Sequence, residues 1–299
     1  MSNNLTLVAP QGDLTDAIVS ETRAALNASG AETGETLWLS PARAADISFS
    51  GMAEADAEGL AAGVIGGRAV DACALPAAGR RKKLLIADMD STILANETLD
   101  EIAAEAGIGE KVADITARSM RGELNFEESL RARVALLAGR DAGIIDAVLD
   151  RIELNPGARA FVATMRNNNA VTALVSGGFT MFTDRVQDWL GFHVAKANDF
   201  EIEDGRLTGR LDGPIVGRET KLQWLEDLGR KHDIGQADAL TIGDGANDLA
   251  MVTSAGLGIA YHGKPILREH ARARIDHTDL RTALYFQGYR DDEISEHWA

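Results

Sequence analysis

Short apolar stretches and helical periods alternate along the first 80 residues. Stretches rich in apolar residues predict strands at positions 5–9, 36–39, 47–49 and 69–75. Apolar residues at helical spacing predict helices at positions 14–26 and 54–62. The resulting order, βαββαβ, is typical of a small ferredoxin-like α+β domain. We therefore expect a first domain at residues 1–80.

The pattern changes at Leu84, where strands begin to be separated by helical segments. A helical region at 97–165, interrupted at Gly107, Gly122 and Gly139, predicts a bundle of short helices. Strands are expected at 84–87, 170–175, 193–197, 239–242 and 257–260, with a hairpin-like segment at 200–211. This alternation predicts an α/β fold with a doubly wound, Rossmann-like parallel sheet. The second domain would span 81–299, with a core at 81–97 and 166–285 and an inserted helical cap at about 98–165.

Composition narrows the class of protein. Apolar residues make up 45% and charged residues 25% of the chain, as in ordinary globular proteins. The formal net charge of −16 argues against nucleic acid or an anionic membrane surface as a partner. Cys73 is the only cysteine, which favours a reducing compartment. Because the sequence begins without a cationic, apolar leader and has no apolar run near ~18 residues, we expect a cytoplasmic protein.

Two carboxylates follow the first strand of the second domain. Asp88 and Asp90 come directly after the apolar run 84–87, where open α/β sheets bind their ligands. The two side chains would project to the same side if extended geometry continued through Met89. Such a pair could hold a hard cation and leave one oxygen free to attack a substrate. A solvated loop with two ordinary acids is the alternative at this point.

Two further strand ends carry polar, glycine-rich turns. Ser176-Gly177-Gly178 offers a hydroxyl and unobstructed backbone N–H groups at the start of a helix, which suits a phosphate. The turn from Gly243 to Asp248 adds Asp244, Asn247 and Asp248. Four acids without a cationic neighbour would repel one another, and all-oxygen ligands select Mg²⁺. Lys221, at the start of an expected helix at 221–230, is the candidate that adds positive charge for a phosphate dianion.

Taken in order, these segments resemble the four motifs of the haloacid dehalogenase superfamily, whose phosphatases use an aspartate nucleophile. The matching segments are Asp88-Met89-Asp90-Ser91-Thr92, Ser176-Gly177-Gly178, Lys221 and Gly243-Asp244-Gly245-Ala246-Asn247-Asp248. Two more stretches resemble the phosphoserine phosphatases of that superfamily. They are Ile93-Leu94-Ala95-Asn96-Glu97-Thr98 and Gly122-Glu123-Leu124-Asn125-Phe126-Glu127-Glu128-Ser129-Leu130-Arg131-Ala132-Arg133-Val134. The resemblance covers about 84–284 and implies the core and inserted cap of that superfamily.

The resemblance also implies a reaction: Mg²⁺-dependent hydrolysis of O-phospho-L-serine to L-serine and phosphate, the last step of L-serine biosynthesis. Asp88 would be the nucleophile that forms an aspartyl-phosphate, and Asp90 the general acid and base. The phosphate would be bound by Ser176, the Gly177 N–H and Lys221.

The remaining site residues also follow from the resemblance. The Asp88 side chain, the Asp90 backbone carbonyl and Asp244 would hold Mg²⁺, and Asp248 and Asn247 would orient a metal-bound water and Lys221. For the substrate, Glu97 would pair with the ammonium group and Arg133 with the carboxylate. Met120 and Phe126 would pack around the short side chain, and Asn247 is also expected at the substrate.

Four further possibilities stay open. The same chemistry would serve a broader small-metabolite phosphatase or a phosphoserine:homoserine phosphotransferase. Residues 1–80 resemble the amino-acid-sensing ACT modules, so a sensing or assembly role could instead dominate. The N-terminal domain could also form the interface of a homodimer.

Overall fold

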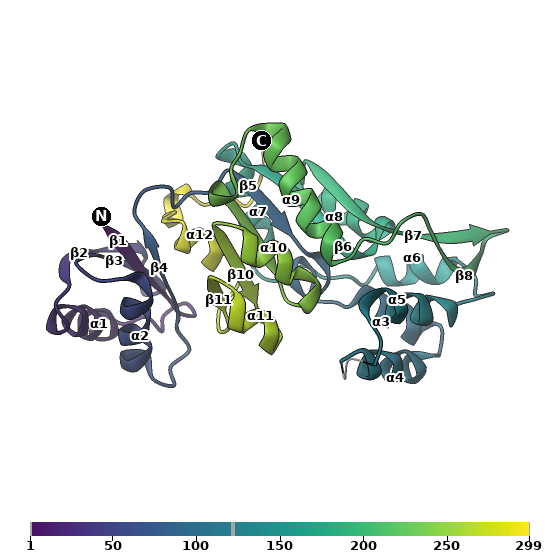
Figure 1. Cartoon of the computed structure of the whole chain (residues 1–299), viewed down its shortest axis with the longest axis horizontal. Helices are drawn as coiled ribbons and strands as arrows, with labels where there is room; N and C mark the ends of the chain where they lie inside the picture. The colour runs from purple at the N-terminus through teal and green to yellow at the C-terminus, as the bar shows by residue number, and fades with distance from the viewer. Residues whose placement is uncertain (1, 121–122, 299) are drawn as a thin grey trace.

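The computed structural model describes residues 2–120 and 123–298, with Met120 described by its backbone alone. Three parts follow one another along the long axis of the molecule (Figure 1). A small α/β unit lies at one end, a larger sheet flanked by helices lies in the middle, and a group of short helices lies toward the other end. Within the described ranges, none of the helices combines the length and the apolar content that crossing a membrane requires.

The N-terminal unit is a four-stranded antiparallel sheet. Its strands are β1 (Asn3–Val8), β2 (Glu32–Ser40), β3 (Ala44–Ser50) and β4 (Asp71–Pro76), and its helices are α1 (Asp16–Ala28) and α2 (Glu54–Ile65). The sheet order β2-β3-β1-β4 confirms the predicted ferredoxin-like arrangement. Alternate strand residues such as Leu5, Leu7 and Phe49 are buried against both helices.

The larger sheet has seven strands in the order β11-β10-β9-β5-β6-β7-β8. They are β5 (Leu84–Ala87), β6 (Val171–Phe179), β7 (Val194–Glu203), β8 (Arg206–Asp212), β9 (Ala239–Gly243), β10 (Leu257–Tyr261) and β11 (Ala273–Ile275). All neighbours pair in parallel except β7 and β8, which form an antiparallel hairpin. The predicted doubly wound parallel sheet is confirmed.

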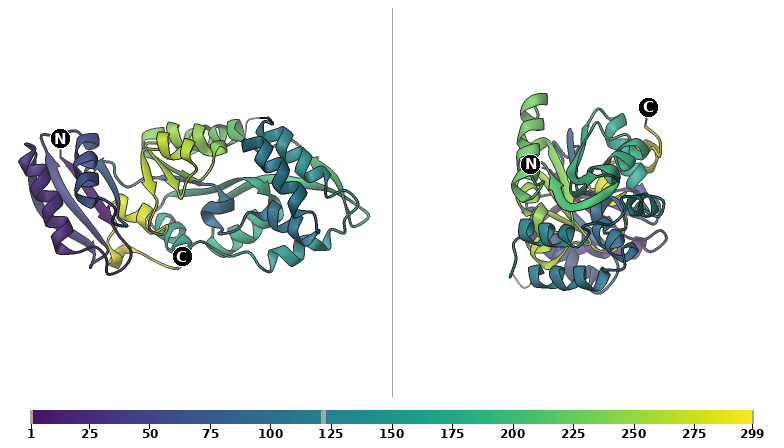
Figure 2. Two further views of the ribbon diagram at one scale, coloured as in Figure 1. Left: turned by 90° about the horizontal axis from the view of Figure 1, so that it is seen from below. Right: turned by 90° about the vertical axis from the view of Figure 1, so that its right-hand side faces the viewer.

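Helices cover both faces of this sheet (Figure 2). One face packs against α9 (Arg218–His232), α10 (Leu249–Ser254) and α11 (Pro265–His270). The other packs against α7 (Ala158–Asn167), α8 (Thr180–Leu190) and α12 (Thr282–Phe286). Strand residues alternate between these layers: Leu84 and Ile86 face the first, Leu85 and Ala87 the second. Because both faces are buried, the central strands read as unbroken apolar runs.

Three local expectations were wrong. The predicted strand at 193–197 and the first arm of the hairpin form one strand, β7, because Asn198 and Asp199 between them pair with Phe179 and Asp212 instead of forming a turn. Helix α9 begins at Arg218, three residues before the expected start, so Lys221 lies in its first turn. The short strand β11 was missed, because three residues carry too little periodicity to be recognised.

The inserted helices are α3 (Thr98–Glu105), α4 (Gly109–Met120), α5 (Phe126–Ala135) and α6 (Gly143–Leu149). The two segments that connect them to the sheet lie side by side, joined by an antiparallel bridge between Leu94 and Leu154. The Asn155 side chain fixes this pairing by donating hydrogen bonds to the carbonyls of Thr92 and Leu94, at 2.8 and 3.0 Å. The chain therefore leaves and re-enters the sheet layer at one point, directly beyond Asp88. Helix α7 packs on β6, α8 and α12.

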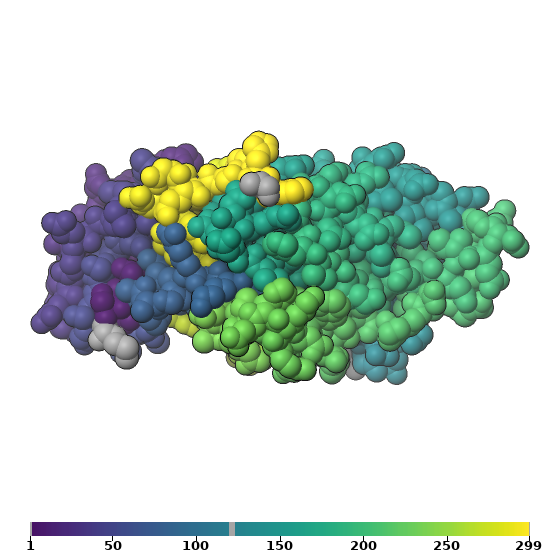
Figure 3. Space-filling model, turned by 90° about the horizontal axis from the view of Figure 1, so that it is seen from above, coloured from purple at the N-terminus to yellow at the C-terminus, as the bar shows by residue number. Residues whose placement is uncertain are grey.

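Buried polar contacts join the N-terminal unit to the C-terminal part of the chain. The Asp71 carboxylate accepts N–H hydrogen bonds from Asp276 and Thr278, at 2.8 and 3.1 Å, and a hydroxyl hydrogen bond from Thr278 at 2.6 Å. Arg80 forms a 2.5 Å ion pair with Asp46 on β3. Figure 3 shows the C-terminal residues, in yellow, lying across this junction.

Replacing Asp71 with alanine should destabilise the whole chain. Several buried donors would lose their acceptor, so we expect the free energy of unfolding to fall by about 3 kcal/mol. Chemical denaturation followed by circular dichroism measures this change. The exposed Asp13 provides the matched control, Asp13→Ala, with an expected change below about 0.5 kcal/mol. Equal stability of the two variants would contradict this role for Asp71.

Candidate active site

Three adjacent strands bring their carboxyl ends to one edge of the sheet. Asp88 follows β5, Ser176 lies near the end of β6, and Asp244 follows β9, and these strands are neighbours in the order β9-β5-β6. A cavity of 740 Å³ opens at this edge, between the sheet and the inserted helices. Its volume is within the range of about 300–1,000 Å³ typical of small-molecule sites.

The Lys221 side chain lies at the base of this edge and is fully buried. Its ammonium group lies 2.7 Å from Asp88 Oδ1 and 2.6 Å from Asp248 Oδ1. Burial alone would lower the pKa of Lys221, but the carboxylates of Asp248 and Asp88 outweigh it and raise the pKa above its usual value. Lys221 is therefore a permanent cation that aligns two carboxylates.

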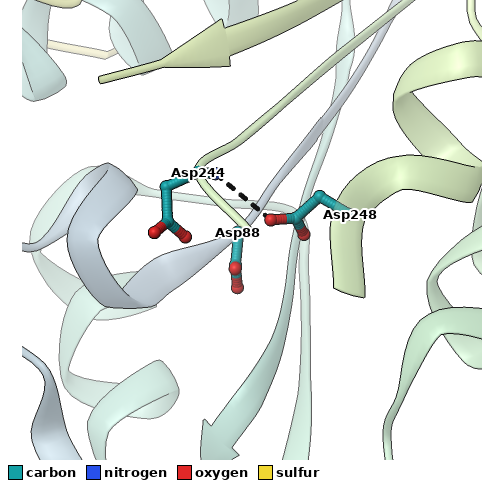
Figure 4. A group of neighbouring side chains, drawn as sticks. All are labelled: Asp88, Asp244 and Asp248. Atoms are coloured by element: carbon teal, nitrogen blue, oxygen red, sulfur yellow. Dashed lines mark hydrogen bonds between the residues drawn. The ribbon is translucent and has the colours of Figure 1, made fainter. Parts of the chain in front are cut away.

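Asp88, Asp244 and Asp248 form a group of buried carboxylates whose oxygens lie within 4.8 Å of one another (Figure 4). Both oxygens of Asp248 are already used, since Oδ1 contacts Lys221 and Oδ2 accepts the N–H groups of Asp244 and Gly245 at 3.2 and 3.0 Å. Burial, and to a lesser degree the charge of Asp88, raise the pKa of Asp244 against the lowering effect of Lys264. Hard oxygen ligands at this separation fit a divalent cation, with Asp88 and Asp244 as the carboxylates that would bind it.

One cation at this edge was missed by the sequence reasoning. Lys264 lies in the turn after β10, and its ammonium group is 3.1 Å from Asp244 Oδ2. The expectation that the acids have no cationic neighbour other than Lys221 was therefore wrong. The signal was present in the sequence, because Lys264 lies near the end of the predicted strand 257–260, at the same edge as the other polar turns.

Asp90 lies in a tight turn rather than in an extended segment. The chain turns at Met89–Ile93, and Leu94 donates its N–H to the Met89 carbonyl at 2.8 Å, so the extended geometry considered for Met89 does not continue. The Asp90 carboxylate nevertheless reaches the cavity, where it accepts the N–H of Thr98 at 2.9 Å. Burial and the charge of Glu97 raise the pKa of Asp90 to about 7.

The Ser176-Gly177-Gly178 turn is tightly packed beside Asp90. The Ser176 hydroxyl accepts the Gly178 N–H at 2.8 Å and lies 3.4 Å from Asp90 Oδ2. A Cβ atom on Gly178 would come within 2.5 Å of Asp90 Oδ2, and one on Gly177 within 2.8 Å of Phe126 Cζ. Both positions therefore require glycine for close approach, not for backbone conformation.

The inserted helices bring the other predicted residues to the cavity. Glu97, Phe126 and Arg133 line it, together with Asn247, whose amide lies 3.5 Å from Asp88 Oδ2. Glu97 accepts a hydrogen bond from the Ser91 hydroxyl at 2.8 Å. The Arg133 guanidinium lies 3.9 Å from the Asp100 carboxylate, and its Nε donates to the Ser129 carbonyl at 3.4 Å. The Met120 side chain is outside the described part of the structure.

The raised pKa of Asp90 predicts a pH-dependent stability in the metal-free protein. Folding keeps a proton on Asp90 that the unfolded chain releases above about pH 4, so the protein loses stability as the pH rises from about 4 to about 7. Asp90→Asn should thus stabilise the protein by about 2–3 kcal/mol more at about pH 8 than at about pH 5. Denaturant unfolding with a chelator measures this difference. A stabilisation independent of pH would contradict the assignment.

Comparison with known proteins agrees with this architecture. The profile of the haloacid dehalogenase-like hydrolase family matches residues 85–253. The chain is 45% identical over 215 residues to a phosphoserine phosphatase of Streptomyces coelicolor, a match that covers 72% of this chain and 52% of that protein. The chain spans only 52–58% of the length of three such curated phosphoserine phosphatases.

Two solved structures are similar to this one. A haloacid dehalogenase family hydrolase from Salmonella enterica superposes with a TM-score of 0.83 at 27% identity, covering 98% of this chain and 100% of that one. A phospho-aspartyl intermediate analogue of a phosphoserine phosphatase superposes with a TM-score of 0.65 at 41% identity, covering 69% of this chain and 99% of that one. Sequence, fold and site geometry agree: the chain belongs to the haloacid dehalogenase-like hydrolase family.

Proposed function

We propose that this chain is a Mg²⁺-dependent phosphoserine phosphatase that hydrolyses O-phospho-L-serine through an aspartyl-phosphate intermediate. One observation carries the proposal: a single cavity is lined by Asp88, Asp90 and the Ser176 turn together with Glu97 and Arg133. The first group suits a phosphate ester, and Glu97 and Arg133 add one acid and one guanidinium, the two charges that an amino acid needs. The similarity to phosphoserine phosphatases supports the same substrate.

In the first step, Asp88 Oδ2 attacks phosphorus, and the bond between phosphorus and the serine oxygen breaks. Oδ2 is the suitable atom, since Oδ1 is held by Lys221 and by the Met89 N–H, at 2.7 and 2.8 Å. Asp90 gives its proton to the departing serine oxygen. A pKa of about 7 keeps a large share of Asp90 protonated near neutral pH, as a general acid requires.

In the second step, Asp90 is a carboxylate and takes a proton from the attacking water. The water oxygen bonds to phosphorus, the bond from phosphorus to Asp88 breaks, and inorganic phosphate leaves. Asp90 is then protonated again, so the cycle closes without another proton donor. In both steps, Lys221 and the Ser176 turn would hold the equatorial phosphate oxygens, where charge spreads in the transition state.

The divalent ion is assigned to the oxygens of Asp88 and Asp244, with the Asp90 backbone carbonyl as the third protein ligand. Bound Mg²⁺ would supply positive charge that offsets the repulsion between Asp88 and the phosphate. Asp248 would orient Lys221 and the turn that carries Asp244, which its contacts to both support. Asn247, 3.5 Å from Asp88, would fix the nucleophile and touch the substrate.

Recognition of serine is assigned to the inserted helices. Arg133 would bind the substrate carboxylate and Glu97 its ammonium group, with Phe126 and Met120 packing around the side chain. The contact of Phe126 with the Gly177 turn supports a closed arrangement that excludes water during phosphoryl transfer.

We further propose the domain organisation: an ACT-like domain at residues 1–80 and a phosphatase domain at 81–299, acting in the cytoplasm. The sheet order of the first unit supports the ACT-like assignment, and the buried, unpaired Cys73 suits a reducing compartment. Since α7 packs on the sheet, we place the end of the cap near residue 154 rather than 165.

The exposed Leu37 on the edge strand β2 supports a homodimer, which a single-chain mass in light scattering would contradict.

The test of the function compares four reactions with and without Mg²⁺, three of which measure phosphate release from a phosphate ester. The proposal predicts turnover of phosphoserine that a chelator abolishes, with much slower turnover of phosphothreonine and a sugar phosphate. Homoserine is added as an acceptor in the fourth reaction, and transfer to it would favour a phosphotransferase. Equal rates on all phosphate esters would favour a broad phosphatase instead.

Arg133 has a matched neighbour for a test of substrate recognition. Arg133→Ala should raise the KM for phosphoserine about tenfold or more, because a charge-assisted contact is worth about 1.5–3 kcal/mol. Arg131, two positions away and exposed, serves as the control in Arg131→Ala. Steady-state kinetics give both values. If the two variants have the same KM, Arg133 does not bind the substrate.

A further inference from the structure

The phosphate-binding turn interrupts the pairing of two strands. Strands β6 and β7 pair in register at Val175 with Lys196 and again at Phe179 with Asn198. Three residues on β6 thus lie opposite a single residue, Ala197, on β7. The extra residues bulge out of the ladder, and their carbonyls lose the backbone partners that a regular strand would give them.

The side chain of Asn198 takes the place of those partners. Its amide nitrogen donates to the carbonyls of Gly177 and Gly178, at 2.8 and 3.2 Å. Its amide oxygen accepts the N–H of Val216 at 2.8 Å. Asn198 is only 2% exposed, so water does not compete for these contacts. Two donors and one acceptor at this spacing require a carboxamide, because a carboxylate has no donor and an ammonium has no acceptor.

The contact to Gly177 also orients the Ser176 hydroxyl. In a trans peptide, the C=O of one residue and the N–H of the next point in opposite directions. With the Gly177 carbonyl directed at Asn198, the Gly178 N–H is directed away from it and donates to the Ser176 hydroxyl at 2.8 Å. That bond occupies an acceptor site of the hydroxyl and leaves its hydrogen free for Asp90 or a bound anion.

The hydrogen bond between Asn198 and Val216 links the Ser176 turn to the start of helix α9, which carries Lys221. Val216 directly precedes Gly217, the N-cap of helix α9, and Lys221 donates its backbone N–H to the Gly217 carbonyl at 3.1 Å. The Phe126 ring contacts the same two segments, since a Cβ on Gly177 or Gly217 would lie 2.8 or 3.4 Å from it. One buried amide therefore joins the turn that carries Ser176 to the start of the helix that carries Lys221.

We propose that Asn198 is a positioning residue that holds the Ser176 turn and the start of helix α9 in fixed register, so that both bind the same phosphate group. The identity of that group rests on the proposed function. Asn198 does not contact the substrate; it acts through Ser176 and Lys221. The metal ligands Asp88 and Asp244 follow other strands, so the affinity for Mg²⁺ should not depend on it.

The test is the Asn198→Asp variant, which keeps the shape of the side chain but replaces the donor with an acceptor. Calorimetry on the full chain measures two affinities: for Mg²⁺ alone, and for inorganic phosphate at saturating Mg²⁺. We expect the phosphate affinity to fall about tenfold or more, as for lost hydrogen bonds at a buried site, with the Mg²⁺ affinity within about twofold of the parent. The control is Asn169→Asp, the same replacement at an exposed position.

If the Asp variant does not fold, Asn198→Ser provides a second variant, because serine keeps a neutral donor and acceptor on a shorter side chain. The phosphate affinity of the Ser variant should fall, while its Mg²⁺ affinity should stay unchanged. Unchanged phosphate affinity in the folded variants would overturn the inference. A parallel loss of both affinities would also overturn it, since that is the result of general structural damage. If the parent binds phosphate in this Asn198-dependent way but does not hydrolyse phosphoserine, the proposed substrate is wrong and the positioning role stands.

Discussion

The buried ammonium group of Lys221 is the interaction on which the catalytic edge depends. It lies within 2.7 Å of carboxylates that follow two different strands, Asp88 and Asp248. An unpaired charge in this position would cost several kcal/mol, so the three groups are stable only together. With Asp244 and Lys264 included, three carboxylates face two ammonium groups, which leaves one excess negative charge. Since Asp90 and Glu97 line the same cavity, a bound divalent cation would offset the excess of negative charge and lower the repulsion of a phosphate dianion.

The sheet order explains why these groups meet. Neighbouring parallel strands end at the same edge, so short turns at the ends of β5, β6 and β9 bring Asp88, the Ser176 turn and Asp244 to one cavity. The chain leaves the sheet to form the inserted helices shortly after Asp88, and the paired connecting segments hold these helices beside the cavity. In the proposed mechanism, the chemistry is thus assigned to the sheet edge and substrate recognition to the inserted segment.

The sequence was sufficient where the physics is local or periodic. Apolar runs identified the buried strands, and polar residues at their ends identified Asp88, Asp90, Ser176 and Asp244. The sequence was insufficient where a contact joins segments that lie far apart along the chain. The position of Lys264 after a predicted strand indicates the edge on which it lies, but not that its ammonium group contacts Asp244. Likewise, the sequence of β7 does not show that the Asn198 side chain bonds the carbonyls left unpaired in β6. The turn after Asp88 also escaped prediction, because its form is set by packing against Gly178 and Thr98 rather than by strand alternation.

The central claim is that Asp88 is the nucleophile aligned by Lys221. The most direct measurement is rapid acid quenching of the enzyme during turnover of phosphoserine with Mg²⁺, followed by mass spectrometry of its peptides. The account predicts a phosphoryl group on Asp88 that forms as fast as serine is first released and disappears when the substrate is exhausted. A phosphoryl group on any other residue, or a burst of serine without a phosphorylated enzyme, would contradict it.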